Sequence, residues 1–119
     1  MNELDREIAE ADRLIDDLRE AAGPPPPAPA HLDAVASAKW RELAAEVGRI
    51  DPGDGDLLEI YCQTWSRWRA ADAQVQELGQ VIKSPSGFPI QNPFLAIANR
   101  AAADLLKIGK RLGLSVPSR

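Results

Sequence analysis

The chain has 119 residues, of which 45% are hydrophobic and 27% charged, and its formal net charge is −4. This length suits one domain, and the single cysteine, Cys62, excludes an internal disulfide. The start, MNELDREIAE, is acidic where a signal peptide would be basic, and no apolar run reaches the ~20 residues that span a bilayer. The sequence therefore predicts a soluble, intracellular protein with no membrane contact.

Residues 1–22 are predicted to form an acidic amphipathic helix. Its apolar residues follow the 3.5-residue period that makes a seam for a partner helix, at Leu4, Ile8, Ala11, Ile15 and Leu18. Such a short helix is marginal alone in water, so the seam must pack on its own domain or on a neighbouring subunit. The candidate partner-binding residues are Leu4, Ile8, Ile15 and Leu18.

Residues 23–30 are predicted to form a proline-rich linker. Gly23 and the four prolines that follow it end the first helix, because proline lacks an amide proton and restricts the residue before it. Such a segment is stiff and extended. A spacer is the favoured interpretation, and a PxxP ligand is the alternative.

A helical domain is predicted over residues 31–119. Its first helix carries an apolar stripe, with Asp33 placed to cap the first turn; the stripe is Leu32, Ala36, Trp40, Leu43 and Val47. The segment DPGDGD at 51–56 superficially suggests calcium, but it lacks EF-hand spacing and is predicted to be a turn and helix cap.

The longest helix is predicted over about residues 56–79. One seam consists of Leu57, Tyr61, Thr64, Trp68, Ala71, Val75 and Leu78, and a second face of Leu58, Cys62 and Trp65. A helix with two apolar faces usually contacts two neighbours. Tryptophans at this spacing indicate core or subunit-interface anchors, and stacking platforms for single-stranded nucleic acid are the alternative. The candidate oligomer-interface residues are Leu57, Tyr61, Trp65, Trp68 and Val75.

Residues 79–93 predict a short β-hairpin or an extended connector. Val81 and Ile82 precede the turn-like SPSG at 84–87, and Phe88 and Ile90 follow it. A lone hairpin is unstable, so it should lie on the helices or on another subunit's hairpin.

The last helix is predicted to begin at Asn92 and Pro93 and to end at Gly113. Its seam consists of Phe94, Ala98, Ala101, Leu105, Ile108 and Leu112, and its basic residues fall largely off that seam. Residues 80–119 carry six basic side chains against one acidic one. Because lysine and arginine neutralise phosphates, the candidate DNA-binding residues are Lys83, Arg100, Lys107, Lys110, Arg111 and Arg119. A solvated helix face explains the same charges.

The sequence offers little support for catalysis. The single histidine, His31, lies at the end of the linker without a nucleophile or second metal ligand at a useful spacing. The chain also lacks the GxxxxGK[ST] loop of an ATPase. We therefore expect no catalytic residues, no metal, no cofactor and a role other than that of an enzyme.

Several ordinary segments form a joint pattern over roughly residues 24–119. They are the proline-containing lead, Leu32-Asp33 with Trp40, the aromatics from Tyr61 to Trp68, Asn92-Pro93, and the ending LGLSVPSR. In this order they resemble the small terminase subunits of tailed phages, the P27-like family. The resemblance implies a mainly α fold of four helices, with a hairpin or connector between the last two, that assembles into a ring-like homo-oligomer. It also implies binding of double-stranded DNA and recruitment or regulation of the large ATPase-nuclease subunit during DNA packaging into capsids.

The net charge of −4 favours weak or nonspecific DNA recognition, which a gene transfer agent or a headful phage would tolerate. Two other functions stay open. The acidic first helix would suit a protein-interaction adaptor without a DNA role. A small helical transcriptional regulator ranks last, because no clear helix-turn-helix stands out.

Overall fold

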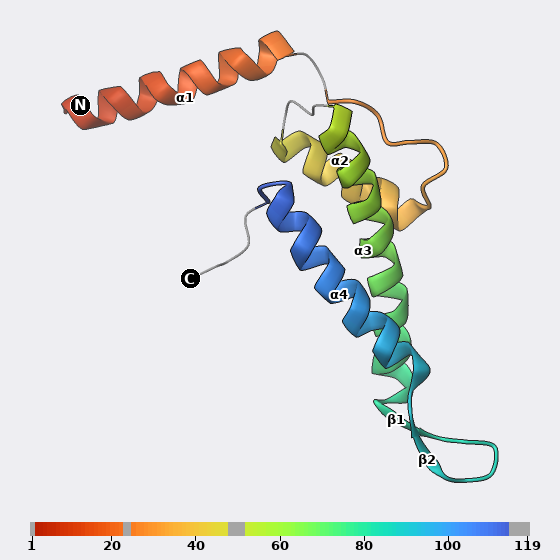
Figure 1. Ribbon diagram of the computed structural model, residues 1–119. Coiled ribbons are helices and arrows are strands. Elements are labelled where there is room, and N and C mark those ends of the chain that lie inside the picture. Colours follow the sequence, from red (N-terminus) through yellow and green to blue (C-terminus); the bar gives the residue numbers. More distant parts are fainter. Residues whose placement is uncertain (1, 23–24, 48–51, 115–119) are drawn as a thin grey trace.

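The computed structural model describes residues 2–22, 25–47 and 52–114, which form four helices and one β-hairpin. In chain order these are α1 (Glu3–Ala22), α2 (Ala34–Val47), α3 (Pro52–Leu78), β1 (Val81–Lys83), β2 (Pro89–Gln91) and α4 (Pro93–Arg111). Helices α3 and α4 run side by side in opposite directions and carry the hairpin at one end, while α1 stands apart (Figure 1). The predicted helical fold, with a hairpin between the last two helices, is confirmed.

The core lies between α2 and the first half of α3. Trp40 and Leu43 of α2 are buried in one cluster with Leu58 and Cys62 of α3. Both α3 residues belong to the second apolar face, so that face packs on α2 while the rest of α3 packs on α4. This arrangement confirms that α3 contacts two neighbours. Trp40 also donates a hydrogen bond from Nε1 to the carbonyl oxygen of Pro26 (2.9 Å), which ties the linker to α2.

Asp33 caps α2 as predicted and also joins α2 to α3. Its Oδ1 accepts the backbone N–H of Ala36 at 2.8 Å, and its Oδ2 accepts the hydroxyl of Ser66 at 2.7 Å. These two hydrogen bonds stabilise the charged carboxylate and therefore lower the pKa of Asp33.

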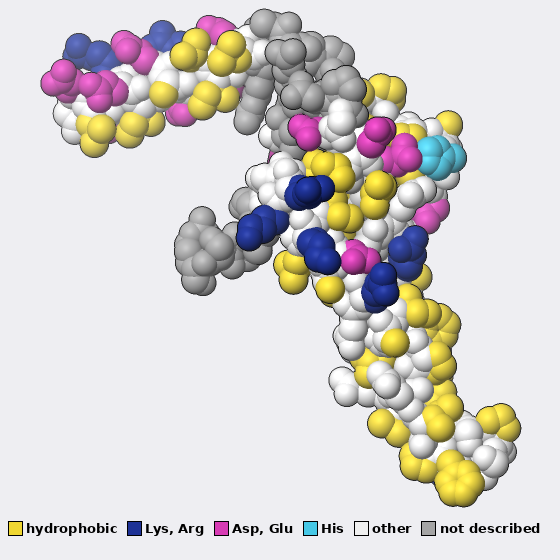
Figure 2. All heavy atoms as spheres, viewed as in Figure 1, with side chains coloured by type: hydrophobic (Ala, Val, Ile, Leu, Met, Phe, Trp, Pro, Cys, Tyr) yellow, Lys and Arg dark blue, Asp and Glu magenta, His cyan; other side chains and the backbone are white. Residues whose placement is uncertain are grey.

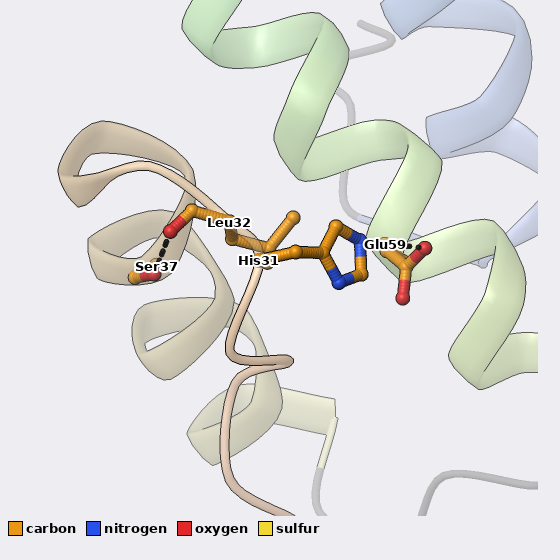
Figure 3. A network of polar contacts seen from close by, with 4 residues as sticks. All are labelled: His31, Leu32, Ser37 and Glu59. Carbon is orange, nitrogen blue, oxygen red and sulfur yellow. Dashed lines mark hydrogen bonds and ion pairs between the residues drawn. The ribbon is translucent and has the colours of Figure 1, made fainter.

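The end of the linker is held by two further polar contacts (Figure 3). His31 points toward α3, where its Nε2 lies 3.4 Å from Oε2 of Glu59, and the hydroxyl of Ser37 donates to the carbonyl of Leu32 at 3.3 Å. The His31 side chain is exposed, so its contact with Glu59 adds little stability. The Leu32 side chain, by contrast, is buried in the core.

Helix α3 begins earlier than the sequence predicts. It starts at Pro52, so the prediction of a turn is wrong for residues 52–56, and residue 51 lies outside the described part of the chain. Proline is favoured in the first turn of a helix, where its missing N–H costs nothing. Asp54 in the same turn interacts favourably with the helix dipole. These terminal effects offset the low helix propensity of the two glycines there.

The hairpin projects from the end of the α3–α4 pair. Val81 pairs with Gln91, Ile82 with Ile90 and Lys83 with Pro89 in antiparallel register. Most side chains of the hairpin are exposed, and Phe88 at its tip is 70% exposed; hydrophobic side chains cover this end of the molecule in Figure 2. The alternative in which the hairpin lies on its own helices is therefore wrong. Contact with another subunit's hairpin stays a prediction.

Asn92 starts α4 and fastens it to the end of α3. Its Oδ1 accepts the N–H of Phe94 at 3.0 Å, and its Nδ2 donates to the carbonyl oxygen of Gly79 at 2.9 Å. The side chain is fully buried. At the other end of α4, Gly113 has a φ of +70° and ends the helix in the left-handed conformation that glycine favours. Both predicted ends of α4 are confirmed.

Candidate nucleic-acid interface

Five exposed basic side chains gather where α3 and α4 lie side by side. This basic face consists of Arg67 from α3 and of Arg100, Lys107, Lys110 and Arg111 from α4. Figure 2 shows Lys and Arg side chains clustered over this part of the molecule. Since phosphate neutralisation supplies most nucleic-acid affinity, this face is a candidate DNA contact.

The seam of α4 determines which way these basic side chains point. Ala98, Ala101 and Gly109 are buried against α3, and small side chains let the two helices approach closely. A Cβ placed on Gly109 would lie 3.4 Å from Cε2 of Tyr61, which leaves room for little more than glycine or alanine. Burial also raises the pKa of the Tyr61 hydroxyl. With the small residues turned inward, the lysines and arginines of α4 face solvent.

Two open depressions follow the basic face along the contact between α3 and α4. The first has a volume of about 550 Å³ and is lined by Leu57, Lys107, Ile108, Lys110 and Arg111. The second has about 390 Å³ and is lined by Arg67, Ala96, Ile97, Arg100, Ala101 and Asp104. Asp104 lies 3.9 Å from Arg100 and offsets one of the positive charges. Both depressions therefore combine apolar floors with basic rims.

The structure brings together four of the six predicted DNA-binding residues. Arg100, Lys107, Lys110 and Arg111 share the basic face, whereas Lys83 lies on β1 in the hairpin. Arg119 lies outside the described residues. The structure adds Arg67, which the sequence analysis missed because its segment, residues 21–79, carries an acidic excess. Arg67 follows Thr64 by three residues and therefore lies at the edge of the α3 seam. This position was the sequence signal that could have placed it beside α4.

The predicted oligomer-interface residues lie on α3 and differ in exposure. The side chains of Leu57, Tyr61, Trp65 and Trp68 are half-buried, whereas Val75 is 7% exposed and is covered within one chain. Leu57, Tyr61, Trp65 and Trp68 thus retain surface for another subunit. Their role in assembly stays a prediction.

Trp65 is the centre of a cluster of aromatic and basic side chains on a different surface. Its ring centroid lies 5.4 Å from that of Trp68, 4.0 Å from Nζ of Lys39 and 5.9 Å from Cζ of Arg69. Cation–π contacts of this kind contribute about 0.5–1 kcal/mol at exposed sites. Trp40, in contrast, is buried in the core, which confirms the core interpretation for that tryptophan.

The predicted partner-binding residues of α1 are uncovered. Leu4, Ile8, Ile15 and Leu18 are between 47% and 62% exposed, and each projects from a helix whose other described side chains are also exposed or half-buried. The alternative in which this seam packs on its own domain is therefore wrong. A partner outside the chain stays the prediction.

Within residues 2–22, 25–47 and 52–114, no group of three His, Cys, Asp or Glu side chains could hold a metal ion. In the same part of the chain, no helix combines the length and apolar character needed to cross a membrane. Cys62 is completely buried, and desolvation raises the pKa of its thiol to about 12, so it is a core residue and a poor nucleophile.

The structure is that of a small, mainly helical protein with an exposed basic face on two adjacent helices. The family model described as phage terminase, small subunit, matches residues 36–119, which is well over half of the chain. The chain therefore belongs to the phage terminase small-subunit family and has a role in phage DNA packaging. Comparisons with curated proteins and with solved structures found no match.

Proposed function

We propose that the protein binds double-stranded DNA through its basic face, as a small terminase subunit of the P27-like kind, during packaging of DNA into capsids. The carrying observation is the arrangement of five exposed basic side chains around one acidic residue, Asp104, at the α3–α4 contact. Each phosphate neutralised by such a side chain releases counterions from the DNA. The role is one of binding and regulation without catalysis, in the cytoplasm of the bacterial host.

The binding is proposed to be weak and nearly independent of sequence. The basic side chains lie on the outer face of a helix packed along α3, and contacts of lysine and arginine with phosphates position DNA without reading its bases. The net charge of −4 opposes binding at a distance. A phage or prophage that packages by the headful, or a gene transfer agent, would suit such recognition. A preference for cognate over random DNA by orders of magnitude would contradict this part of the proposal.

Charge reversal tests the DNA contact. The variant with Lys107→Glu and Lys110→Glu should weaken DNA binding, measured by fluorescence anisotropy over a range of salt concentrations. If both side chains contact phosphates, the slope of log affinity against log salt should fall in magnitude by about 1.8, since each contact contributes about 0.9. The matched control reverses Arg6 and Arg13 on α1, which changes the net charge equally but lies outside the basic face.

The comparison of the two variants decides between DNA binding and the adaptor alternative. Loss confined to the α4 variant supports the basic face. Equal loss in both variants would mean that total charge alone governs binding. Unchanged binding in the α4 variant would favour a protein-interaction adaptor, for which the uncovered acidic helix α1 is the supporting observation.

Self-association into a ring is the second part of the proposal. The half-buried side chains of Leu57, Tyr61, Trp65 and Trp68 supply an apolar and aromatic surface of the kind that anchors interfaces. The projecting hairpin, whose strand edges and Phe88 are uncovered, supplies another. Native mass spectrometry of the full chain should detect a closed oligomer. A monomer at micromolar concentration would contradict ring assembly.

Recruitment or regulation of the large ATPase-nuclease subunit completes the proposal. Family membership supports this partner, and the uncovered surfaces of α1 and of the hairpin are available for it. Co-purification of tagged large subunit with the full chain tests the contact directly. Retention of the large subunit by an unrelated acidic protein to the same extent would show a nonspecific charge effect.

A further inference from the structure

The uncovered face of α1 is both apolar and acidic. Successive residues of an α-helix turn by about 100°, so the seam of Leu4, Ile8, Ala11, Ile15 and Leu18 forms one stripe. The same geometry places Glu3 and Glu7 on one side of that stripe and Asp5 and Asp12 on the other. Arg6 and Arg13 fall on the opposite face. The surface that α1 offers to a partner is therefore a row of leucines and isoleucines that is edged by carboxylates over residues 3–12.

The first depression of the basic face has the complementary chemistry. Leu57 and Ile108 provide apolar side chains, and Lys107, Lys110 and Arg111 surround them. Leu106 lies beside Lys107 and Lys110 on the outer surface of α4 and is 63% exposed. Helix α4 has 19 residues and α1 has 20, so the two are both about 30 Å long. The two depressions together extend along α4 from Ala96 to Arg111, so their apolar and basic lining follows α4 over a length similar to that of the α1 seam.

The arrangement of α1 favours docking on a second copy of the chain rather than on its own domain. Trp40 fixes the carbonyl of Pro26 at the surface of α2, and three residues, Gly23, Pro24 and Pro25, separate this anchor from the end of α1. In the described part of the chain the seam of α1 is exposed, so its own domain does not cover it. In the structure α1 extends away from α4 (Figure 1).

We propose that α1 of one copy docks, through its apolar seam, on the basic face of a second copy. A helix of this length is marginally stable without tertiary packing, so docking stabilises α1 as well as the assembly. Burying the leucine and isoleucine side chains supplies the affinity, and the carboxylates facing Lys107 and Lys110 fix the orientation.

Docking has a regulatory consequence that rests on the proposed DNA contact. The carboxylates of α1 pair with the basic side chains that would otherwise neutralise phosphates. DNA and α1 therefore compete for one surface. If the docked form exceeds the open form about tenfold, DNA affinity is reduced by about the same factor. The acidic helix would then keep the basic face closed until DNA at high local concentration, or another protein that binds α1, displaces it.

Crosslinking between two full-length chains tests the docking without DNA. One chain carries Ala11→Cys at the middle of the α1 seam, and the other carries Ala103→Cys, between Arg100 and Lys107 on the exposed surface of α4. Both positions lie near the middle of their helices, so they meet whether the helices dock parallel or antiparallel. With different tags on the two chains, a short bismaleimide should yield a product that carries both tags. Cys62 is completely buried and should not react.

The matched control places the cysteine on the opposite face of α1. Arg13→Cys combined with Ala103→Cys should give at least severalfold less product than the seam pair. Equal yields from both faces of α1, or no product from the seam pair, would overturn the proposal. A chain that carries both Ala11→Cys and Ala103→Cys should crosslink to other copies; a product formed only within single chains would overturn docking in trans.

A DNA measurement then separates this inference from the proposed function. Replacing Leu4, Ile8, Ile15 and Leu18 by serine leaves the net charge unchanged and should raise DNA affinity by about tenfold, because the basic face opens. The same variant should lose the seam crosslink. Formation of the seam crosslink by the cysteine pair, together with no DNA binding by the chain, would contradict the proposed function and support docking. A chain that binds DNA through Lys107 and Lys110 without forming the crosslink would overturn docking and leave the proposed function intact.

Discussion

Replacing Asn92 with alanine is expected to destabilise the fold by about 2–3 kcal/mol, because one buried side chain both caps α4 and binds the end of α3. Loss of the hydrogen bond from the Phe94 N–H to Oδ1 removes a helix cap worth about 1 kcal/mol. Loss of the bond from Nδ2 to Gly79 costs about another 1 kcal/mol, and more if the carbonyl is left without a partner. At about 4 °C per kcal/mol, the melting temperature should fall by about 10 °C.

Urea denaturation followed by circular dichroism at helical wavelengths measures this loss in the full chain. Asn92→Asp keeps the capping oxygen but places a carboxylate against the Gly79 carbonyl, so it should be no more stable than the alanine variant. Asn2→Ala is the matched control, since Asn2 makes the same kind of cap with Asp5 at the exposed start of α1. The reasoning would be refuted if Asn92→Ala lowered the free energy of unfolding by less than about 0.5 kcal/mol, or by the same amount as Asn2→Ala.

Three further predictions concern the core and its edges. The pKa of Asp33 is lowered in the fold, so its carboxylate stabilises the fold at a pH above the unfolded pKa of about 4, and this contribution is lost as the pH falls through the lower folded pKa. Asp33→Ala should therefore reduce the loss of folding stability on acidification. An unchanged dependence of stability on pH in the acid range would contradict this. Cys62, whose pKa is raised to about 12, should react with iodoacetamide at pH 8 only after unfolding, and rapid native labelling would contradict its burial. Trp40→Phe keeps an aromatic ring in the core but removes the bond to Pro26, so unfolding should cost about 1 kcal/mol less; no change in the urea midpoint would show that this bond is not a net contributor.

Much of the secondary structure follows from local chemistry that the sequence carries. Asp33, Asn92 with Pro93, and Gly113 predicted helix ends correctly, because capping depends on side chains within a few residues of the end. The start of α3 was predicted too late, because DPGDGD resembles a turn and its proline is also compatible with a first helical turn. Local signals of this kind cannot decide between two structures that both satisfy them.

The sequence by itself determined the helical pattern, the division of charge and the family resemblance. Only the tertiary structure decided which charges form one surface, because that depends on how α3 and α4 are rotated against each other around Gly109 and the alanines. It removed Lys83 from the basic face and added Arg67, which lies in a segment, residues 21–79, that carries an acidic excess overall. It also decided that the apolar seam of α1 is exposed and is not covered by the part of the chain that the structure describes. Periodicity predicts that such a stripe must pack, but the partner is a matter of long-range contacts, which local sequence patterns do not specify.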